Sequence, residues 1–376
     1  MPSEAPAVDT SFKSWFNEAR YRQFARDVGA ISPTFDPRQF LKLTLEGLEE
    51  RELMDRLRQL AIAFEGSQPG TYREKLQILR RLAPGIGHNF VAIALSEFVA
   101  RYGLDDPRTS LEALRFFTPF GSAEFAVRAF LQRDLAGTLA VMRSWATDPN
   151  EHVRRLASEG SRPRLPWGLR LQALVRDPDP TGPILEALKA DPSLYVRKSV
   201  ANHLNDISRD HPERVLDRLE CWDRTNPATA WIVRRALRTL IKQGQPRALA
   251  LIGVHASAVR AVNVSGFRVS PGKLVLGDTV TLQASLANRA ASPVALVVDY
   301  VVHYVRASGK ASAKVFKWAV TELPARGELV LEKRQVIRDF TTRRHYPGPH
   351  RVELQVNGQR LAESGFTLSL PATRRR

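Results

Sequence analysis

One basic segment of the chain combines an acid, several arginines and a tryptophan at spacings that could do chemistry. Arg155, Glu159 and Arg162 recur at i, i+4 and i+7 and therefore share one face of a predicted helix. Prolines within 163–166 end that helix and stiffen a loop that carries Trp167. Neighbouring guanidinium groups keep such an acid ionised, and the carboxylate can then stabilise a developing positive charge. A simpler interpretation also stays open, in which Glu159 pairs with Arg155 and Trp167 is a core aromatic.

Other familiar catalytic motifs are missing from the sequence. It contains no P-loop, GxGxxG, HExxH or GxSxG pattern. The eight histidines form no metal-ligand cluster, and the single cysteine, Cys221, excludes an intramolecular disulfide and a cysteine-built metal site. We therefore expect neither a metal nor an organic cofactor, and any catalysis must use isolated acids on a basic surface.

The charge of the chain indicates its partner. The 376 residues hold 56 Lys and Arg against 39 Asp and Glu, a net charge of +17. The sequence pI is about 10.5, which is typical of proteins that bind polyanions. The alternative is a ribosome-associated or merely basic protein. No run approaches the ~20 apolar residues of a membrane helix, and the N-terminus shows no secretory signal, so the cytoplasm is the expected compartment.

The hydrophobic pattern divides the chain into two parts. Up to about Gly253 apolar residues recur at spacings of three and four, and Asp-Pro or Asn-Pro pairs punctuate the pattern as expected N-caps. After Val254 the pattern alternates, and Asn357-Gly358 between two alternating runs predicts a β-hairpin. We predict an all-α solenoid of HEAT-like repeats over 1–255 and an all-β immunoglobulin-like sandwich over 256–376. The second part carries 19 Lys and Arg against 8 Asp and Glu, a net charge of +11.

An internal repeat aligns cations in the helical part. Val153, Val196 and Val233 each follow a punctuating pair and lie 43 and 37 residues apart, a spacing in the HEAT range. Stacked repeats would form two columns of cations suited to a nucleic-acid backbone, one of Arg155, Lys198 and Arg235 and one of Arg154, Arg197 and Arg234. In one of these columns the arginines have an alternative role as partners of the capping aspartates.

Three segments resemble a known family. The segment 158–167 (SEGSRPRLPW) is similar to the DNA alkylation repair glycosylases of the AlkC type, relatives of AlkD. Segments 196–206 (VRKSVANHLND) and 229–237 (TAWIVRRAL) support the resemblance, which covers roughly Phe98 to Gly244. The Ig-like extension matches what some AlkC members carry.

The resemblance implies a monofunctional glycosylase of base excision repair. Its substrates would be cationic N3-methylated bases in duplex DNA, chiefly 3-methyladenine and also 3-methylcytosine, excised without full flipping of the base, in contrast to most glycosylases. We further expect a monomer without an obligate protein partner, which DNA binding associates with the nucleoid in a bacterial cytoplasm. The competing hypothesis is a non-catalytic HEAT-like module that binds nucleic acid or acts as a protein scaffold.

The candidate residues follow from this resemblance and from the charge pattern. The candidate catalytic acids are Glu159, Glu124 and Asp206, although Glu124 equally fits an acid at a helix N-terminus that Ser122 caps, and Asp206 equally fits a cap of the next segment. Trp167 would contact the lesion. The candidate DNA-binding cations are Arg154, Arg155, Arg162, Arg164, Arg197, Lys198, Arg234, Arg235, Lys314, Lys317, Arg343 and Arg344.

Overall fold

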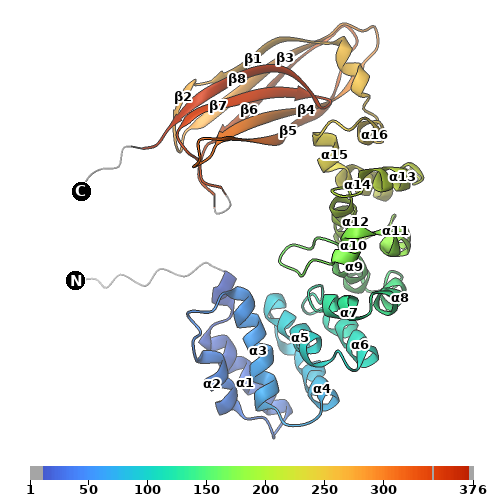
Figure 1. Cartoon of the computed structure of the whole chain (residues 1–376), viewed down its shortest axis with the longest axis vertical. Helices are drawn as coiled ribbons and strands as arrows, with labels where there is room; N and C mark the ends of the chain where they lie inside the picture. Colours follow the sequence, from blue (N-terminus) through green and yellow to red (C-terminus); the bar gives the residue numbers. More distant parts are fainter. Residues whose placement is uncertain (1–11, 341–342, 372–376) are drawn as a thin grey trace, which may run out of the picture. The chain divides into compact units, whose positions relative to one another are not determined.

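A computed structural model of the chain describes residues 12–340 and 343–371. By their contacts these residues divide into two compact units (Figure 1). The first unit extends to Asp210 and includes 223–232, and the second contains 211–222 and everything from Val233 onward. The predicted boundary at 255/256 lies inside the second unit and stays a prediction about which segments fold together.

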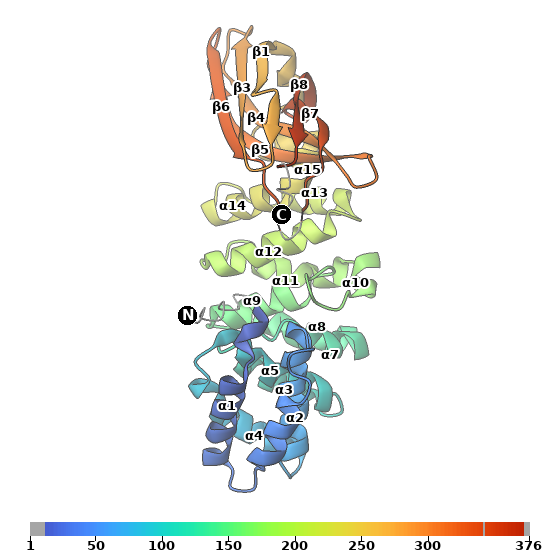
Figure 2. The ribbon, with the colours of Figure 1, turned by 90° about the vertical axis from the view of Figure 1, so that its left-hand side faces the viewer.

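Helices build the first unit, as the apolar periodicity predicted. They are η1 (Phe12–Trp15), α1 (Glu18–Ile31), α2 (Pro37–Leu45), α3 (Leu53–Ser67), α4 (Tyr72–Leu82), η2 (Ala83–Gly85), α5 (Asn89–Tyr102), α6 (Pro107–Phe117), α7 (Val127–Arg133), α8 (Leu135–Trp145), α9 (Glu151–Gly160), α10 (Gln172–Arg176), η3 (Asp179–Thr181), α11 (Gly182–Ala187) and α12 (Leu194–Ile207). Helices α9 and α12, which begin two successive repeats, pack against each other, and Figure 2 shows them in neighbouring layers. Val153 and Val196 are both buried there, so the repeat is confirmed as a packing unit.

The punctuating pairs start helices in two ways. Asp106 caps α6 and Asn226 accepts from the first turn of α14 (Pro227–Ala236), so proline takes the first helical position as predicted. The same expectation is wrong at Asp148 and Asp191, because α9 and α12 begin later. Both carboxylates instead accept backbone N–H groups two residues on and ion-pair with arginines of the preceding repeat.

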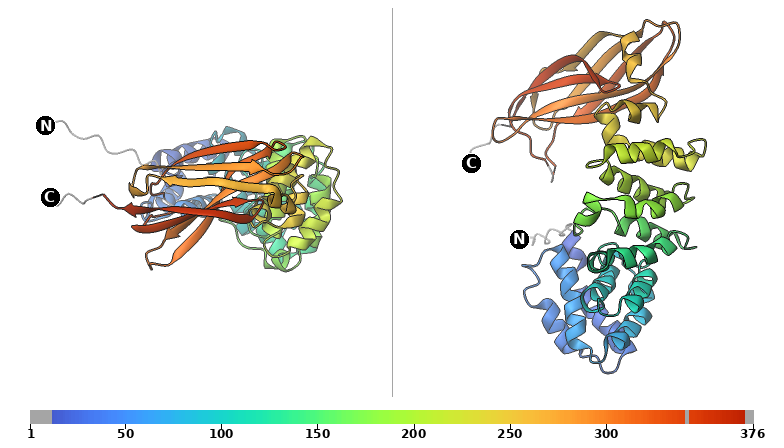
Figure 3. Two further views of the ribbon diagram at one scale, coloured as in Figure 1. Left: turned by 90° about the horizontal axis from the view of Figure 1, so that it is seen from above. Right: turned by 45° about the vertical axis from the view of Figure 1, so that its right-hand side comes forward.

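The second unit holds the remaining helices and the sandwich. Its helices are α13 (Pro212–Glu220), α15 (Arg238–Lys242), α16 (Pro246–Ala250) and η4 (Ala256–Ala261). One sheet has the order β1-β3-β6 and the other β2-β8-β7-β4-β5, which confirms the predicted sandwich (Figure 3). The strands are β1 (Val262–Ser270), β2 (Lys273–Val275), β3 (Thr279–Asn288), β4 (Val294–Val305), β5 (Ala311–Leu323), β6 (Glu328–Val336), β7 (Gly348–Val356) and β8 (Gln359–Ser369).

Local signals explain two features of the sheets. Asn357 and Gly358 both have positive φ, at 47° and 82°, and join β7 to β8 in the hairpin that their sequence predicted. The β-branched run of β4 is central to its sheet, between β7 and β5, and is buried almost throughout. The core lies between the two sheets and includes Leu282, Tyr300 and Phe366.

Candidate active site

Helix α9 and the loop after it position the residues that the sequence singled out. Asn150 caps the helix, and its buried face ends at Gly160, where an added Cβ would come within 2.5 Å of Val127 on α7. This close approach requires a glycine. The chain then enters a loop of residues 161–171, here called the Trp167 loop, because prolines at 163 and 166 prevent the helix from continuing.

The three candidate acids lie in one charged network. Glu159 Oε1 accepts from Arg162 Nη1 at 2.6 Å and lies 3.5 Å from Arg155 Nη2. Arg162 Nε also donates to Asp206 Oδ2 at 2.8 Å, and Arg155 Nη1 donates to Glu124. The charged network is thus an unbroken series from Glu124 through Arg155, Glu159 and Arg162 to Asp206. It joins the turn before α7, helix α9, the Trp167 loop and helix α12.

Two expected helix caps are wrong, those of Ser122 and Asp206. Ser122 donates through Oγ to Glu124 Oε2 at 2.5 Å and accepts from Arg155, and it does not cap α7. Asp206 lies inside α12 and accepts from Arg162. By contrast, the alternative pairing of Glu159 with Arg155 is present within the larger network.

The network is mostly covered by protein. The side chains of Glu124, Glu159 and Asp206 are 13%, 7% and 4% exposed. Burial raises the pKa of Asp206, although the adjacent Arg162 acts in the opposite direction. Burying a carboxylate without a partner is unfavourable, so the arginines offset the cost of burying the three acids.

Trp167 extends into solvent from its loop. Its side chain is 65% exposed and its φ is +62°, a left-handed conformation rare for a residue with a Cβ. The interpretation of Trp167 as a core aromatic is therefore wrong, because Leu165 and Leu171 fill the buried positions of the loop. An exposed aromatic in a strained conformation is typical of a functional position.

The predicted cation columns have different environments. Arg154 donates to Asp191 at 2.7 Å and to the carbonyls of Asp148 and Pro149, and Arg197 donates to the carbonyls of Asp191 and Pro192. Arg154 therefore pairs with an aspartate of the next repeat, as the alternative held, whereas Arg197 donates to backbone carbonyls just before its own helix. Three other candidate cations, Lys198, Arg234 and Arg235, are exposed. Arg155 and Arg162 belong to the charged network. Arg164 pairs with Asp210 at 2.8 Å.

The candidate cations of the sandwich lie on or near its β5 edge. Lys314 and Lys317 are exposed on β5, and Arg344 is exposed in the segment before β7. Arg343 lies over the rings of Tyr304 and Phe316, at 4.7 Å and 5.8 Å from their centroids. Such stacking orients a guanidinium group and still leaves donors at its edge.

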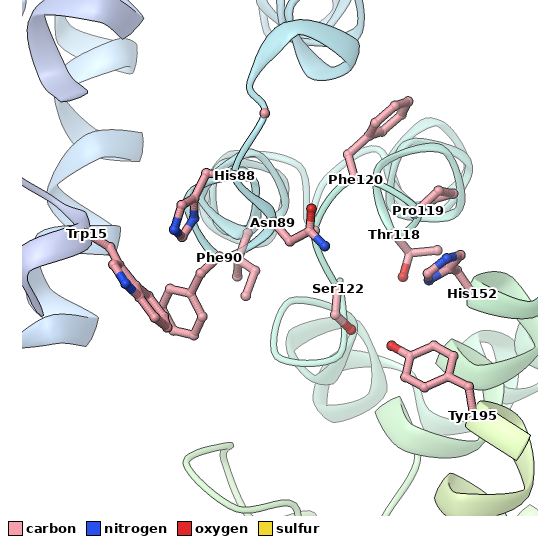
Figure 4. A pocket seen from close by; sticks show the side chains of 13 residues that line it. Trp15, His88, Asn89, Phe90, Thr118, Pro119, Phe120, Ser122, His152 and Tyr195 are labelled. Atoms are coloured by element: carbon pink, nitrogen blue, oxygen red, sulfur yellow. The ribbon is translucent and has the colours of Figure 1, made fainter. Parts of the chain in front are cut away.

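Sequence reasoning missed a cleft beside the charged network, and it missed two residues, Tyr195 and Arg128. The cleft has a volume of about 520 Å³, and its lining includes Trp15, His88, Phe90, Ser122, His152 and Tyr195 (Figure 4). In Figure 4 the hydroxyl of Tyr195 points toward Ser122. Arg155 lies 5.0 Å from the Tyr195 ring, and Ser122 of the cleft lining donates to Glu124, so the cleft adjoins the charged network. The second missed residue, Arg128, is fully buried on α7. The sequence gives no signal for Tyr195 or Arg128, because the surroundings of each side chain come from segments that are distant along the chain.

No metal site or membrane helix emerges from the described residues. No group of three or more His, Cys, Asp or Glu side chains within them is placed to hold a metal ion. None of the helices in the described ranges is long and apolar enough to cross a membrane.

Comparisons with known proteins cover nearly the whole chain. The family model of the DNA alkylation repair enzymes matches residues 118–240, and the model of the C-terminal Ig-like domain of the uncharacterised protein YhaZ matches 263–370. YhaZ of Bacillus subtilis is 38% identical over 92% of this chain and 96% of its own length. A solved structure, the alkylpurine DNA glycosylase AlkC of Pseudomonas fluorescens bound to DNA with an abasic site analog, is 48% identical, with a TM-score of 0.92 over 95% of this chain and 99% of that one.

The chain belongs to the AlkC family of DNA alkylation repair enzymes. The charged network and the Trp167 loop both lie inside the segment that the repair-enzyme model matches. This AlkC family member also has the Ig-like domain, and the sandwich begins at Val262, one residue before the second family match.

Proposed function

We propose that this AlkC family member is a monofunctional DNA glycosylase that removes cationic N3-methylated bases, chiefly 3-methyladenine and also 3-methylcytosine, from duplex DNA. The similarity to a DNA-bound alkylpurine glycosylase over almost the full length supports the glycosylase activity. The observation that carries the proposal is the charged network, which holds three carboxylates together on a strongly basic protein.

The chemistry of the lesion determines what the protein must supply. An N3-methylated adenine is already a cation, so the N-glycosidic bond breaks and its electron pair leaves with a neutral base. The sugar then carries the positive charge, and a water oxygen bonds to C1′ while its proton passes to a carboxylate. A carboxylate near the sugar both stabilises the oxocarbenium-like transition state and accepts that proton. One charge pair at ~4 Å is worth about 4 kcal/mol at an effective dielectric constant near 20, an upper guide to one acid.

Glu159 is the first candidate for that carboxylate. It lies at the centre of the network and contacts both Arg155 and Arg162. Glu124 and Asp206 lie at the two ends and are the alternatives. A lyase reaction through a Schiff base is not expected, because the network contains no lysine.

Duplex contacts come from residues outside the network. We assign phosphate contacts to the exposed cations Lys198, Arg234, Arg235, Lys314, Lys317 and Arg344. Trp167, which is exposed on the loop that also carries Arg162, would contact the sugar or base of the lesion. An aromatic wedge of this kind makes the nucleotide accessible without a full flip into a pocket.

Release of free base from methylated duplex DNA tests the proposal. Wild-type protein should release 3-methyladenine, and Glu159→Gln should lose release while it keeps duplex binding. Glu151→Gln is the matched control, because Glu151 is an exposed acid on the same helix. If the wild type binds the duplex and releases no base, the chain is a non-catalytic binding module and the proposal is wrong.

A further inference from the structure

Arg128 is a buried arginine with an unusual set of partners. Its side chain is fully buried on α7, and its Nε donates to the carbonyl of Leu169 at 2.6 Å. Its Nη1 donates to the carbonyls of Gly160 at 2.9 Å and Arg162 at 2.8 Å. One planar guanidinium group thereby joins the end of α9 to both ends of the Trp167 loop.

The Trp167 loop has few anchors near Trp167 itself, although elsewhere in the loop Arg164 pairs with Asp210 and both Leu165 and Leu171 are buried. Within the loop, Gly168 donates its N–H to the Leu165 carbonyl and Leu171 donates to Pro163, both at 3.2 Å. Trp167 and Leu169 are exposed, so apolar packing does not hold this end of the loop. A left-handed conformation at Trp167 is unfavourable for a residue with a Cβ, and neighbouring contacts must therefore maintain it.

Arg128 also lies close to the charged network. Burial lowers the pKa of its guanidinium to about 10, which leaves it charged at neutral pH. The nearby carboxylates of Glu159, Asp206 and Glu124 favour that charge, while Arg162 opposes it. Three guanidinium groups therefore accompany the three carboxylates, and the buried region is close to neutral.

We propose that Arg128 is the positioning residue of the site. Its bonds to the Gly160, Arg162 and Leu169 carbonyls hold the Trp167 loop closed, so that Trp167 is presented to the DNA. The same bonds fix the backbone of Arg162, whose side chain bridges Glu159 and Asp206. Arg128 itself contacts no substrate. The kinetic part of this inference rests on the proposed function, and the structural part does not.

The variant Arg128→Lys tests the proposal, because lysine keeps the buried charge and loses the planar fork. Arg56→Lys is the matched control: Arg56 is also buried and donates to three carbonyls, those of Lys13, Phe16 and Arg51, far from the loop along the chain. We expect amide exchange in residues 161–171 to rise about tenfold or more in Arg128→Lys without DNA, and not in Arg56→Lys.

The second readout is single-turnover base excision. In Arg128→Lys the rate of the folded protein should fall about tenfold or more, while the duplex Kd changes less than about threefold. Arg56→Lys should keep the wild-type rate. Unchanged loop exchange in Arg128→Lys, or equal losses of rate in both variants, would overturn the proposal. The amide-exchange result can be read even if the wild type excises no base. Failure of the proposed function can therefore be told apart from failure of the Arg128 proposal.

If Arg128→Lys does not fold, amide exchange in the wild-type protein still tests the proposal. The proposal requires the amides of Gly168 and Leu171 to exchange together with those of α7, since one opening releases both. Much faster exchange of these two amides than of α7 contradicts it.

Discussion

The site depends on residues that folding alone would not favour. Trp167 exposes a large aromatic side chain and has a left-handed backbone. Natural proteins retain such positions where function needs them, and stability is lost in exchange. A substitution of Trp167 can therefore show an effect on activity separately from an effect on stability.

Trp167→Gly should lower activity without lowering stability. Glycine adopts a φ of +62° freely, and the lost side chain makes little buried contact, so the unfolding free energy should stay equal or rise by about 1 kcal/mol. Base excision should fall about tenfold or more if the indole contacts the lesion. Thermal unfolding and single-turnover assays measure the two effects, and Trp167→Phe should retain part of the activity. A large loss of stability in Trp167→Gly would show that the side chain is structural.

The sequence predicted part of this residue-scale geometry. The i, i+4, i+7 spacing correctly brought Arg155, Glu159 and Arg162 together, since all three join one network. The spacing was wrong to place Arg162 on the helix, because α9 ends at Gly160 and Arg162 lies in the Trp167 loop. It did not predict that Glu159 is buried, because α12 and the turn before α7 cover it. Arg128 gave no signal for a similar reason: on α7 it is one more cation, and its burial arises from the Trp167 loop folding over it.

At the scale of the elements, aspartates and arginines connect successive repeats. Arg115 pairs with Asp148 and Arg154 pairs with Asp191, so each repeat supplies an acid to an arginine of the repeat before it. The Asp-Pro pattern predicted a break in the helices at both places, and this was correct. The position of the cap was not, because these contacts between repeats cannot be read from one segment.

Arg154→Ala and Lys198→Ala should separate repeat stability from DNA binding. Arg154→Ala leaves Asp191, whose side chain is 3% exposed, without its charged partner, and should lower the unfolding free energy by roughly 2–4 kcal/mol. Lys198 is exposed, so Lys198→Ala should change stability by less than about 0.5 kcal/mol. For Lys198→Ala, the slope of the logarithm of the duplex binding constant against the logarithm of the salt concentration should be smaller in magnitude by about 1. Urea unfolding and binding titrations at several salt concentrations check both, and the reverse pattern would contradict this assignment.

Strand β4 contains a buried acid that favours its protonated form. Asp299 follows a β-bulge and is 1% exposed, with one carboxylate oxygen accepting from Gln355 and the other without a hydrogen-bond partner. Burial raises its pKa to about 6 from an ordinary value of 3.8, against the effect of Lys242. Between these values the folded protein binds more protons than the unfolded chain, so stability falls as pH rises from about 4 to 6 and stays lower above that.

Asp299→Asn should therefore stabilise the protein at neutral pH. We expect a gain of roughly 1–3 kcal/mol at pH 7.5 that disappears toward pH 4. The matched variant Asp339→Asn should have the opposite sign, because the N–H of His345 lowers the pKa of that exposed acid. Urea unfolding across pH measures both variants. A gain in Asp299→Asn that does not vary with pH would show that the titration of Asp299 is not its cause.

At the scale of the whole molecule, the helices after Val233 belong with the sandwich. Gln355 donates to the carbonyl of Lys242 at 3.0 Å, and Asn357 donates to that of His255 at 3.2 Å. Gly244 and Gly358 meet so closely that a Cβ on either would clash. The change of hydrophobic pattern after Val254 lies close to the first strand, which begins at Val262. Contacts such as that of Asn357 with His255 span about a hundred residues and have no local pattern.

Native-state hydrogen exchange should reveal this grouping. We expect the protected amides of α15 and α16 to exchange at the same free energy as those of β4 and β7, since they open together. Helix α9 should exchange at a different free energy, as part of the first unit. Exchange of α15 and α16 together with α9, and not with the strands, would instead support a folding boundary near residue 255.

The central claim is that Glu159 stabilises positive charge on the sugar, and binding to two abasic duplexes tests it most directly. One duplex carries a pyrrolidine nucleotide, whose ring nitrogen is cationic at neutral pH, and the other a neutral tetrahydrofuran. The account predicts that the wild type and Glu151→Gln bind the cationic site about tenfold or more tightly, and that Glu159→Gln loses the preference. Equal affinity of the wild type for both duplexes would contradict it.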